Sequence, residues 1–79
     1  MQACNLDTVT KAEELVSISR KYNNLDVDII YGRCIVDGRS FLGVISLVGH
    51  MVTVEAYGEN EKSVTDFCNE VKEKIGVWK

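Results

Sequence analysis

The 79-residue sequence has no proline, only one histidine and one tryptophan, and no long apolar run. A membrane-spanning helix needs about 20 mostly apolar residues, and a secretion signal needs an apolar stretch behind a basic N-terminus. Neither pattern occurs, so we expect a cytoplasmic protein that does not contact membranes. Linkers, repeats and low-complexity segments are also missing. Because so short a chain forms one core, the sequence predicts a single domain over residues 1–79.

The sequence also lacks the patterns of metal, redox and nucleic-acid sites. Cys4, Cys34 and Cys68 form no Cys-x-x-Cys pair, and no His, Cys, Asp and Glu residues have metal-ligand spacing. We expect three reduced, buried cysteines and no cofactor or metal. The formal net charge is −3 and the basic residues are scattered. Nucleic acid is a poor partner for such a chain, because its binding depends on clustered Lys and Arg.

Hydrophobic periodicity predicts four strands and three helices. The strands are expected at residues 1–5, 26–31, 33–37 and 51–57, and the helices at 10–22, 40–47 and from residue 60 to about 75. Thr10 and Glu13 have the spacing of a capping box. Ser40 and Asn60 are typical N-cap residues for the second and third helices.

The apolar positions predict which side of each element faces the core. The expected inner residues are Ala12, Leu15, Val16, Ser19 and Tyr22 in the first helix, Val52, Val54 and Ala56 in the last strand, and Val64, Phe67, Cys68, Val71 and Ile75 in the last helix. Half-buried antiparallel strands are commonly covered by helices on one side. The sequence therefore predicts an α+β fold, with a four-stranded antiparallel sheet and three helices on one face (β-α-β-β-α-β-α).

Three consecutive segments are specific enough to suggest a family. They are Tyr31-Gly-Arg-Cys-Ile-Val-Asp-Gly38, Arg39-Ser-Phe-Leu-Gly-Val-Ile-Ser-Leu47 and Val52-Thr-Val-Glu-Ala-Tyr-Gly-Glu-Asn60. Together they resemble HPr, the histidine phosphocarrier family of the bacterial sugar phosphotransferase system, and the resemblance extends over nearly the whole chain. It implies the open-faced β-sandwich of that family.

The resemblance fails at the position of the phosphorylated histidine. Thr8 stands there, with Thr10 and Lys11 in place of the arginine and proline that follow it in the family. A threonine hydroxyl needs an activating base, and the nearby carboxylates would repel phosphate. We expect Thr8 and Thr10 to start a helix and His50, the only histidine, to lie in a solvated turn. The alternative is a phosphocarrier with an atypical or lost phosphoacceptor.

Ser40 falls on the serine that a dedicated kinase phosphorylates in many HPr proteins of Gram-positive bacteria, and Arg39 falls on the basic position before it. A catabolite-repression branch of the family, Crh, lacks the histidine and keeps this serine. The resemblance thus implies regulatory phosphorylation at Ser40, the alternative being a plain helix cap. It also implies that Phe41, Leu42 and Ile45 form a partner-docking patch, the alternative being that they belong to the core.

These observations favour a regulatory or adaptor protein over an enzyme. Its expected partners are proteins, such as an HPr kinase/phosphorylase or a transcriptional regulator in carbon-catabolite control. Two other classes stay open: the phosphocarrier with an atypical acceptor, and a small-molecule-binding or purely structural relative. Trp78 is expected to fold back over the edge of the domain.

Overall fold

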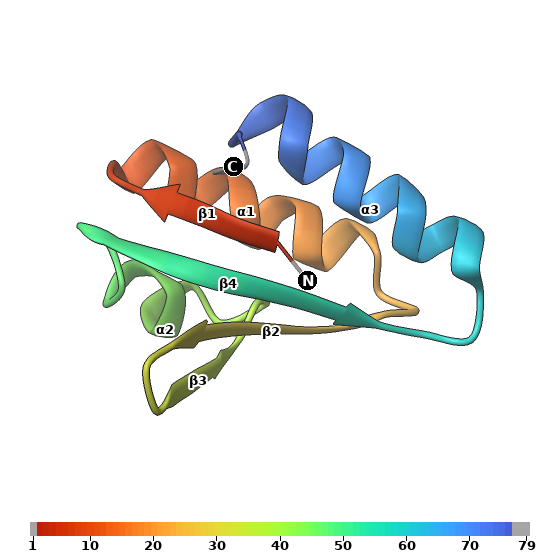
Figure 1. Cartoon of the computed structure of the whole chain (residues 1–79), viewed down its shortest axis with the longest axis horizontal. Coiled ribbons are helices and arrows are strands. Elements are labelled where there is room, and N and C mark those ends of the chain that lie inside the picture. The colour runs from red at the N-terminus through yellow and green to blue at the C-terminus, as the bar shows by residue number, and fades with distance from the viewer. Residues whose placement is uncertain (1, 77–79) are drawn as a thin grey trace.

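The computed structural model describes residues 2–76, so the expectations for Met1 and Trp78 lie outside the described residues. The strands are β1 (Gln2–Leu6), β2 (Asp26–Tyr31), β3 (Cys34–Asp37) and β4 (His50–Tyr57), and the helices are α1 (Val9–Lys21), α2 (Phe41–Ile45) and α3 (Glu61–Lys74). The predicted element order is confirmed (Figure 1). In the described part of the chain, no helix has the length and hydropathy to span a membrane.

The four strands form one antiparallel sheet in the order β1-β4-β2-β3. The short first strand lies at an edge, where only one side needs pairing. β2 and β3 are joined by a two-residue turn in which Gly32 adopts a φ of +58°, a conformation that glycine tolerates better than other residues. The predicted hairpin is confirmed, although its second strand begins at Cys34 rather than at residue 33.

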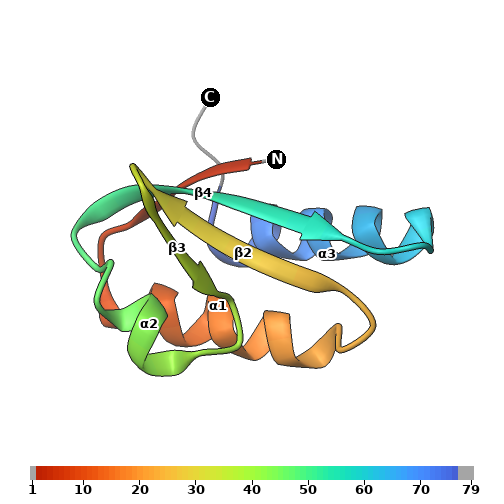
Figure 2. The same ribbon diagram turned by 90° about the horizontal axis from the view of Figure 1, so that it is seen from below.

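All three helices cover the same face of the sheet (Figure 2). Helix α1 contacts both α2 and α3, and α2 also contacts β3. Within residues 2–76, no helix lies on the opposite face of the sheet (Figure 2). The coarse fold prediction, an α+β fold with an open four-stranded antiparallel sheet and three helices, is confirmed.

The core lies between the sheet and the helices. Its buried apolar residues are Cys4, Leu6, Ala12, Leu15, Val16, Ile18, Leu25, Val27, Ile29, Val44, Leu47, Val52, Val54, Phe67, Val71 and Ile75. The predicted inner faces are largely confirmed, while Tyr22, Ala56, Val64 and Cys68 are only partly buried against the core. Buried Ser19 keeps its hydroxyl satisfied by donating to the Leu15 carbonyl at 2.8 Å.

The N-caps of the helices are polar side chains, as predicted, but the capping box predicted for α1 is at the wrong residues. Thr8, not Thr10, caps α1, and its Oγ1 accepts a hydrogen bond from the Lys11 backbone N–H at 3.2 Å. The capping-box prediction at Thr10 and Glu13 is therefore wrong by two residues, whereas the expectation that Thr8 starts a helix is confirmed. Asn60 caps α3 as expected and accepts from two backbone N–H groups.

A polar network joins α1 to α3 above the core. The Lys21 ammonium donates to both oxygens of Glu70, at 2.8 and 3.0 Å, and the Tyr22 hydroxyl donates to Glu70 Oε1 at 3.0 Å. The Tyr22 ring packs edge-on against Phe67. The hydrogen bond from Lys21, followed by that from Tyr22, holds the pKa of Glu70 below its ordinary value of 4.5 against the opposing effect of burial.

The lowered pKa of Glu70 predicts an acid-dependent loss of stability. Because the pKa of Glu70 is lower in the folded chain than in the unfolded chain, its ionised carboxylate stabilises the fold. This stabilisation is complete above the ordinary pKa of 4.5 and is lost as the pH falls through the lower folded value. Glu70→Gln should therefore lower the melting temperature at pH 7 and have a smaller effect at pH 3, measured by circular dichroism. Glu73→Gln, at an exposed position of the same helix, is the control. An equal effect of Glu70→Gln at both pH values would contradict the assignment.

Candidate functional site

Helix α2 is short and is capped by Ser40. The Ser40 Oγ accepts a hydrogen bond from the Gly43 backbone N–H at 3.3 Å, and the serine is exposed. The predicted cap is confirmed. A Cβ on Gly43 would lie 3.2 Å from both Ser40 Oγ and Val36 Cβ. The glycine therefore lets α2 approach β3 closely, which fixes the outward side of the helix.

The apolar side chains of α2 divide between core and solvent. Val44 and Leu47 are buried, whereas Leu42 is 79% exposed and Phe41 is 38% exposed. Ile45 is partly buried and packs against the core. Of the three predicted docking residues, Leu42 and Phe41 are thus exposed at the surface near Ser40. Ile45 mainly packs against the core.

Arg39 connects α2 to the end of α1. Its guanidinium donates to the backbone carbonyls of Tyr22 and Leu25, which follow the last turn of α1. In return, the Arg20 guanidinium donates to the Arg39 carbonyl at 3.2 and 3.3 Å. Sequence analysis gave Arg39 only the role of a basic residue before the serine and missed this backbone contact. Arg20 was missed as well, because a contact between residues 19 positions apart leaves no local pattern.

The structure separates Thr8 from Ser40. Thr8 is at the N-terminus of α1, while Arg39, next to Ser40, contacts the residues that end this helix. A 13-residue helix is about 20 Å long, so the Arg39 guanidinium lies at the end of α1 opposite Thr8. The far end of α2 lies nearer the start of α1, since the Gly49 N–H donates to the Leu6 carbonyl. Thr8 Oγ1 is occupied as a cap, and Lys11 forms an ion pair with Asp7 at 3.0 Å. Among the described residues, no hydrogen bond joins Thr8 to Ser40.

The prediction that His50 lies in a turn is wrong, because His50 is the first residue of β4. The ring stacks on Tyr31 with 4.3 Å between the ring centroids. It is exposed, so the expected solvation is retained. The prediction failed because Gly49 N–H donates to the Leu6 carbonyl, which allows pairing with β1 to begin at His50. Within residues 2–76, no group of three or more His, Cys, Asp or Glu side chains is arranged to hold a metal ion.

The cysteines differ in burial. Cys4 is buried, and burial, with a smaller contribution from Cys68, raises the pKa of its thiol to about 11. Such a thiol is a weak nucleophile at neutral pH. Cys68 is partly buried, but Cys34 is exposed at the start of the edge strand β3. The expectation of three core cysteines is therefore wrong for Cys34, because β3 has no strand beyond it.

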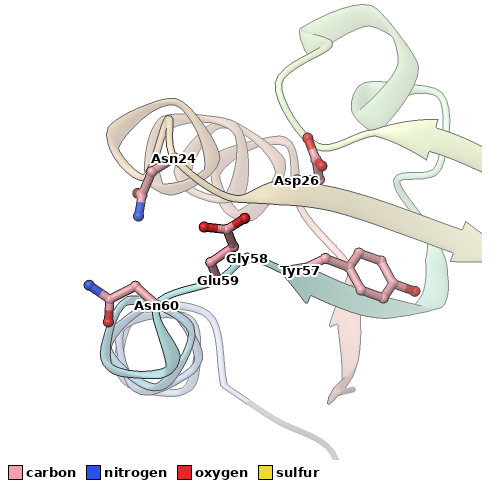
Figure 3. A pocket seen from close by; sticks show the side chains of 6 residues that line it. All are labelled: Asn24, Asp26, Tyr57, Gly58, Glu59 and Asn60. Carbon is pink, nitrogen blue, oxygen red and sulfur yellow. The ribbon is translucent and has the colours of Figure 1, made fainter.

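A hollow of about 470 Å³ lies where β2 begins and β4 ends (Figure 3). It is lined by Asn24, Asp26, Tyr57, Gly58, Glu59 and Asn60. The Glu59 carboxylate points into the space between Asn24 and Asp26 (Figure 3). This hollow was not predicted from the sequence. Alternating polar and apolar residues in 26–29 and 52–56 were the available signal.

Neither protein-family models nor curated proteins match this chain. Membership of the HPr family thus stays a prediction from the three segments quoted above. The open sheet with three helices agrees with the architecture that the resemblance implies.

The contacts of Arg39 predict that its side chain stabilises the fold. Arg39→Met should lower the free energy of unfolding by about 1–3 kcal/mol, because it leaves two backbone carbonyls without their charged donor. Urea unfolding measures this loss. Arg33→Met, in the exposed turn between β2 and β3, is the matched control and should have little effect. Equal stability of the two variants would show that the Arg39 contacts do not stabilise the fold.

Proposed function

We propose that this chain is a cytoplasmic, HPr-like regulatory or adaptor protein that does not act as a phosphocarrier and binds other proteins through α2. The observation that carries the proposal is the exposure of Leu42, at 79%, directly beside the capping residue Ser40. An exposed leucine and a partly exposed phenylalanine on one short helix are suited to a small, transient interface. Such interfaces commonly depend on a few apolar or aromatic anchors.

Ser40 provides a means of control at this interface. A phosphate there would add a charge of about −2 next to Leu42, and would therefore change what the helix can bind. The Arg20 guanidinium, bound to the neighbouring Arg39 carbonyl, is a cation close to this position. The Arg39 guanidinium is engaged with the carbonyls of Tyr22 and Leu25. Phosphorylation would thus alter the docking surface without requiring the helix to unfold.

The alternative, a phosphocarrier with an atypical acceptor, has less support. The Thr8 hydroxyl accepts the capping hydrogen bond from Lys11, and no histidine lies at this helix start. His50 is stacked on Tyr31. Neither side chain has the combination of nucleophile and helix N-terminus that favours phosphoryl transfer.

The proposal predicts phosphorylation at Ser40 and nowhere else. Incubation with ATP and an HPr-type kinase should label the wild-type chain and Ser46→Ala, but not Ser40→Ala. Ser46 is the matched control, because it is an exposed serine at the other end of α2. Phospho-Enzyme I should transfer no label. Absence of kinase labelling would contradict the regulatory role, and label on Thr8 or His50 from phospho-Enzyme I would favour the phosphocarrier.

The exposed anchor predicts a docking defect that is separable from folding. Leu42→Ala should weaken kinase binding by about 1–3 kcal/mol, a common cost for an interface anchor, seen as a higher KM for phosphorylation of Ser40. Its melting temperature should be nearly unchanged, because the side chain is 79% exposed. Met51→Ala, another exposed apolar residue on the other face of the sheet, is the control. An unchanged KM for Leu42→Ala would contradict docking through α2.

A further inference from the structure

The uncovered face of the sheet has an ordered pattern of side chains. On β2 and β4, Val27, Ile29, Val52 and Val54 are buried under the helices. Since successive strand residues point to opposite faces, the residues between them belong to the uncovered face, which we call the open face. Its exposed apolar members include Ile35, at 63%, and Met51, at 41%.

Two adjacent rows cross the open face. The first, which we call the isoleucine row, follows the pairs Ala3–Thr53, Thr53–Ile30 and Ile30–Ile35 across all four strands. The second, the acidic row, follows the pairs Glu55–Asp28 and Asp28–Asp37 across β4, β2 and β3. An apolar stripe and a carboxylate stripe therefore lie side by side, about 7 Å apart along the strands.

The acidic row is poorly neutralised. Asp37 lies 4.0 Å from the Arg39 guanidinium, but Asp28 and Glu55 have no ion-pair partner among residues 2–76. Tyr57 donates its hydroxyl to the Glu55 carboxylate. This bond raises the pKa of Tyr57, with smaller effects of burial and of the charges on Glu55 and Asp28. Asp26 continues the acidic surface next to Tyr57, and both line a hollow of about 340 Å³ together with Asp28, Asp37 and the cationic Arg39.

This arrangement has a cost for folding. Like charges directly opposite each other on neighbouring strands destabilise a sheet, and here three carboxylates are adjacent. A binding partner of opposite charge would relieve the repulsion.

We propose that the open face binds a cationic amphipathic helix of a partner protein. The four-stranded isoleucine row spans about 14 Å, which a helix of about three turns covers. A helix is about 10 Å wide, so one helix lying across the strands reaches both rows. Its apolar side packs on Ile30 and Ile35, and Lys or Arg residues along one edge pair with Asp28 and Glu55. A second copy of this chain fits poorly, because stacking two open faces brings two acidic rows together.

A pair of synthetic peptides tests the charge requirement. The first is a 12-residue helical peptide, the length being about three turns, with leucines on one side and lysines along one edge; the second carries glutamates in place of the lysines. Titration of the nitrogen-15-labelled chain, followed by NMR, should show shifts at Ile30, Ile35 and Thr53 for the lysine peptide only. Binding of both peptides, of neither, or shifts centred on α2 would overturn the proposal.

Two double variants that remove the same net charge test whether binding depends on the acidic row. Asp28→Asn with Glu55→Gln should weaken binding of the lysine peptide about fivefold, the effect expected from two exposed ion pairs. Glu13→Gln with Glu73→Gln, at exposed positions on the helices, removes the same charge and should leave the affinity unchanged. An equal loss in both double variants would show non-specific attraction to a negative protein and would overturn the proposal.

Two further measurements separate binding from folding and from the role of α2. The variant with Asp28→Asn and Glu55→Gln should melt at the same or a higher temperature than the wild type, because like-charge repulsion is removed. A clearly lower melting temperature would mean that the row serves the fold instead. Leu42→Ala should leave the affinity for the lysine peptide unchanged, so the α2 proposal and the open-face proposal can fail independently. Dependence on Leu42 would place the peptide on α2 and contradict the open-face site.

Discussion

The structure depends on one constraint: a short chain buries only one face of its sheet. The core lies between the sheet and three helices that all cover the same side (Figure 2). The helices of residues 2–76 form one layer, and none of them covers the opposite face. The residues on that face, and the outward residues of the helices, are therefore exposed to solvent or available to a partner.

The same constraint explains why α2 presents an apolar surface. The helix has five residues, too few to hold itself in place without its packing. Val44 supports it from the core, Gly43 allows close contact with β3, and the Arg39 guanidinium ties its start to the end of α1. Because these contacts use the inner side of the helix, Leu42 is left outward. The exposed patch thus follows from how α2 is anchored.

Much of the fold could be predicted from the sequence, because alternation in β4 and the helical spacing in α1 and α3 are local patterns. Ser40 and Asn60 were correct as caps for the same reason. The misplaced cap of α1 was a local error, since Thr8 and Thr10 are both suitable cap residues. The other failures came from contacts between distant residues. The pairing of β1 with β4 extended the strand to His50, and the edge position of β3 exposed Cys34. The Arg39 contacts appear only when the segment after β3 packs against the end of α1, and the acidic row appears only when β2, β3 and β4 are aligned. Whether Ser40, Phe41 and Leu42 act in regulation remains a proposal from the resemblance.

The central claim is that α2, and not the N-terminus of α1, is where a regulatory protein docks. NMR line broadening and shift mapping of the labelled chain with an unlabelled HPr-type kinase tests it most directly, since both helix starts are observed in one spectrum. The account predicts that the perturbed amides centre on Ser40, Phe41 and Leu42 and leave Thr8 unaffected. Perturbation centred on Thr8 and Lys11, with α2 unaffected, would contradict it.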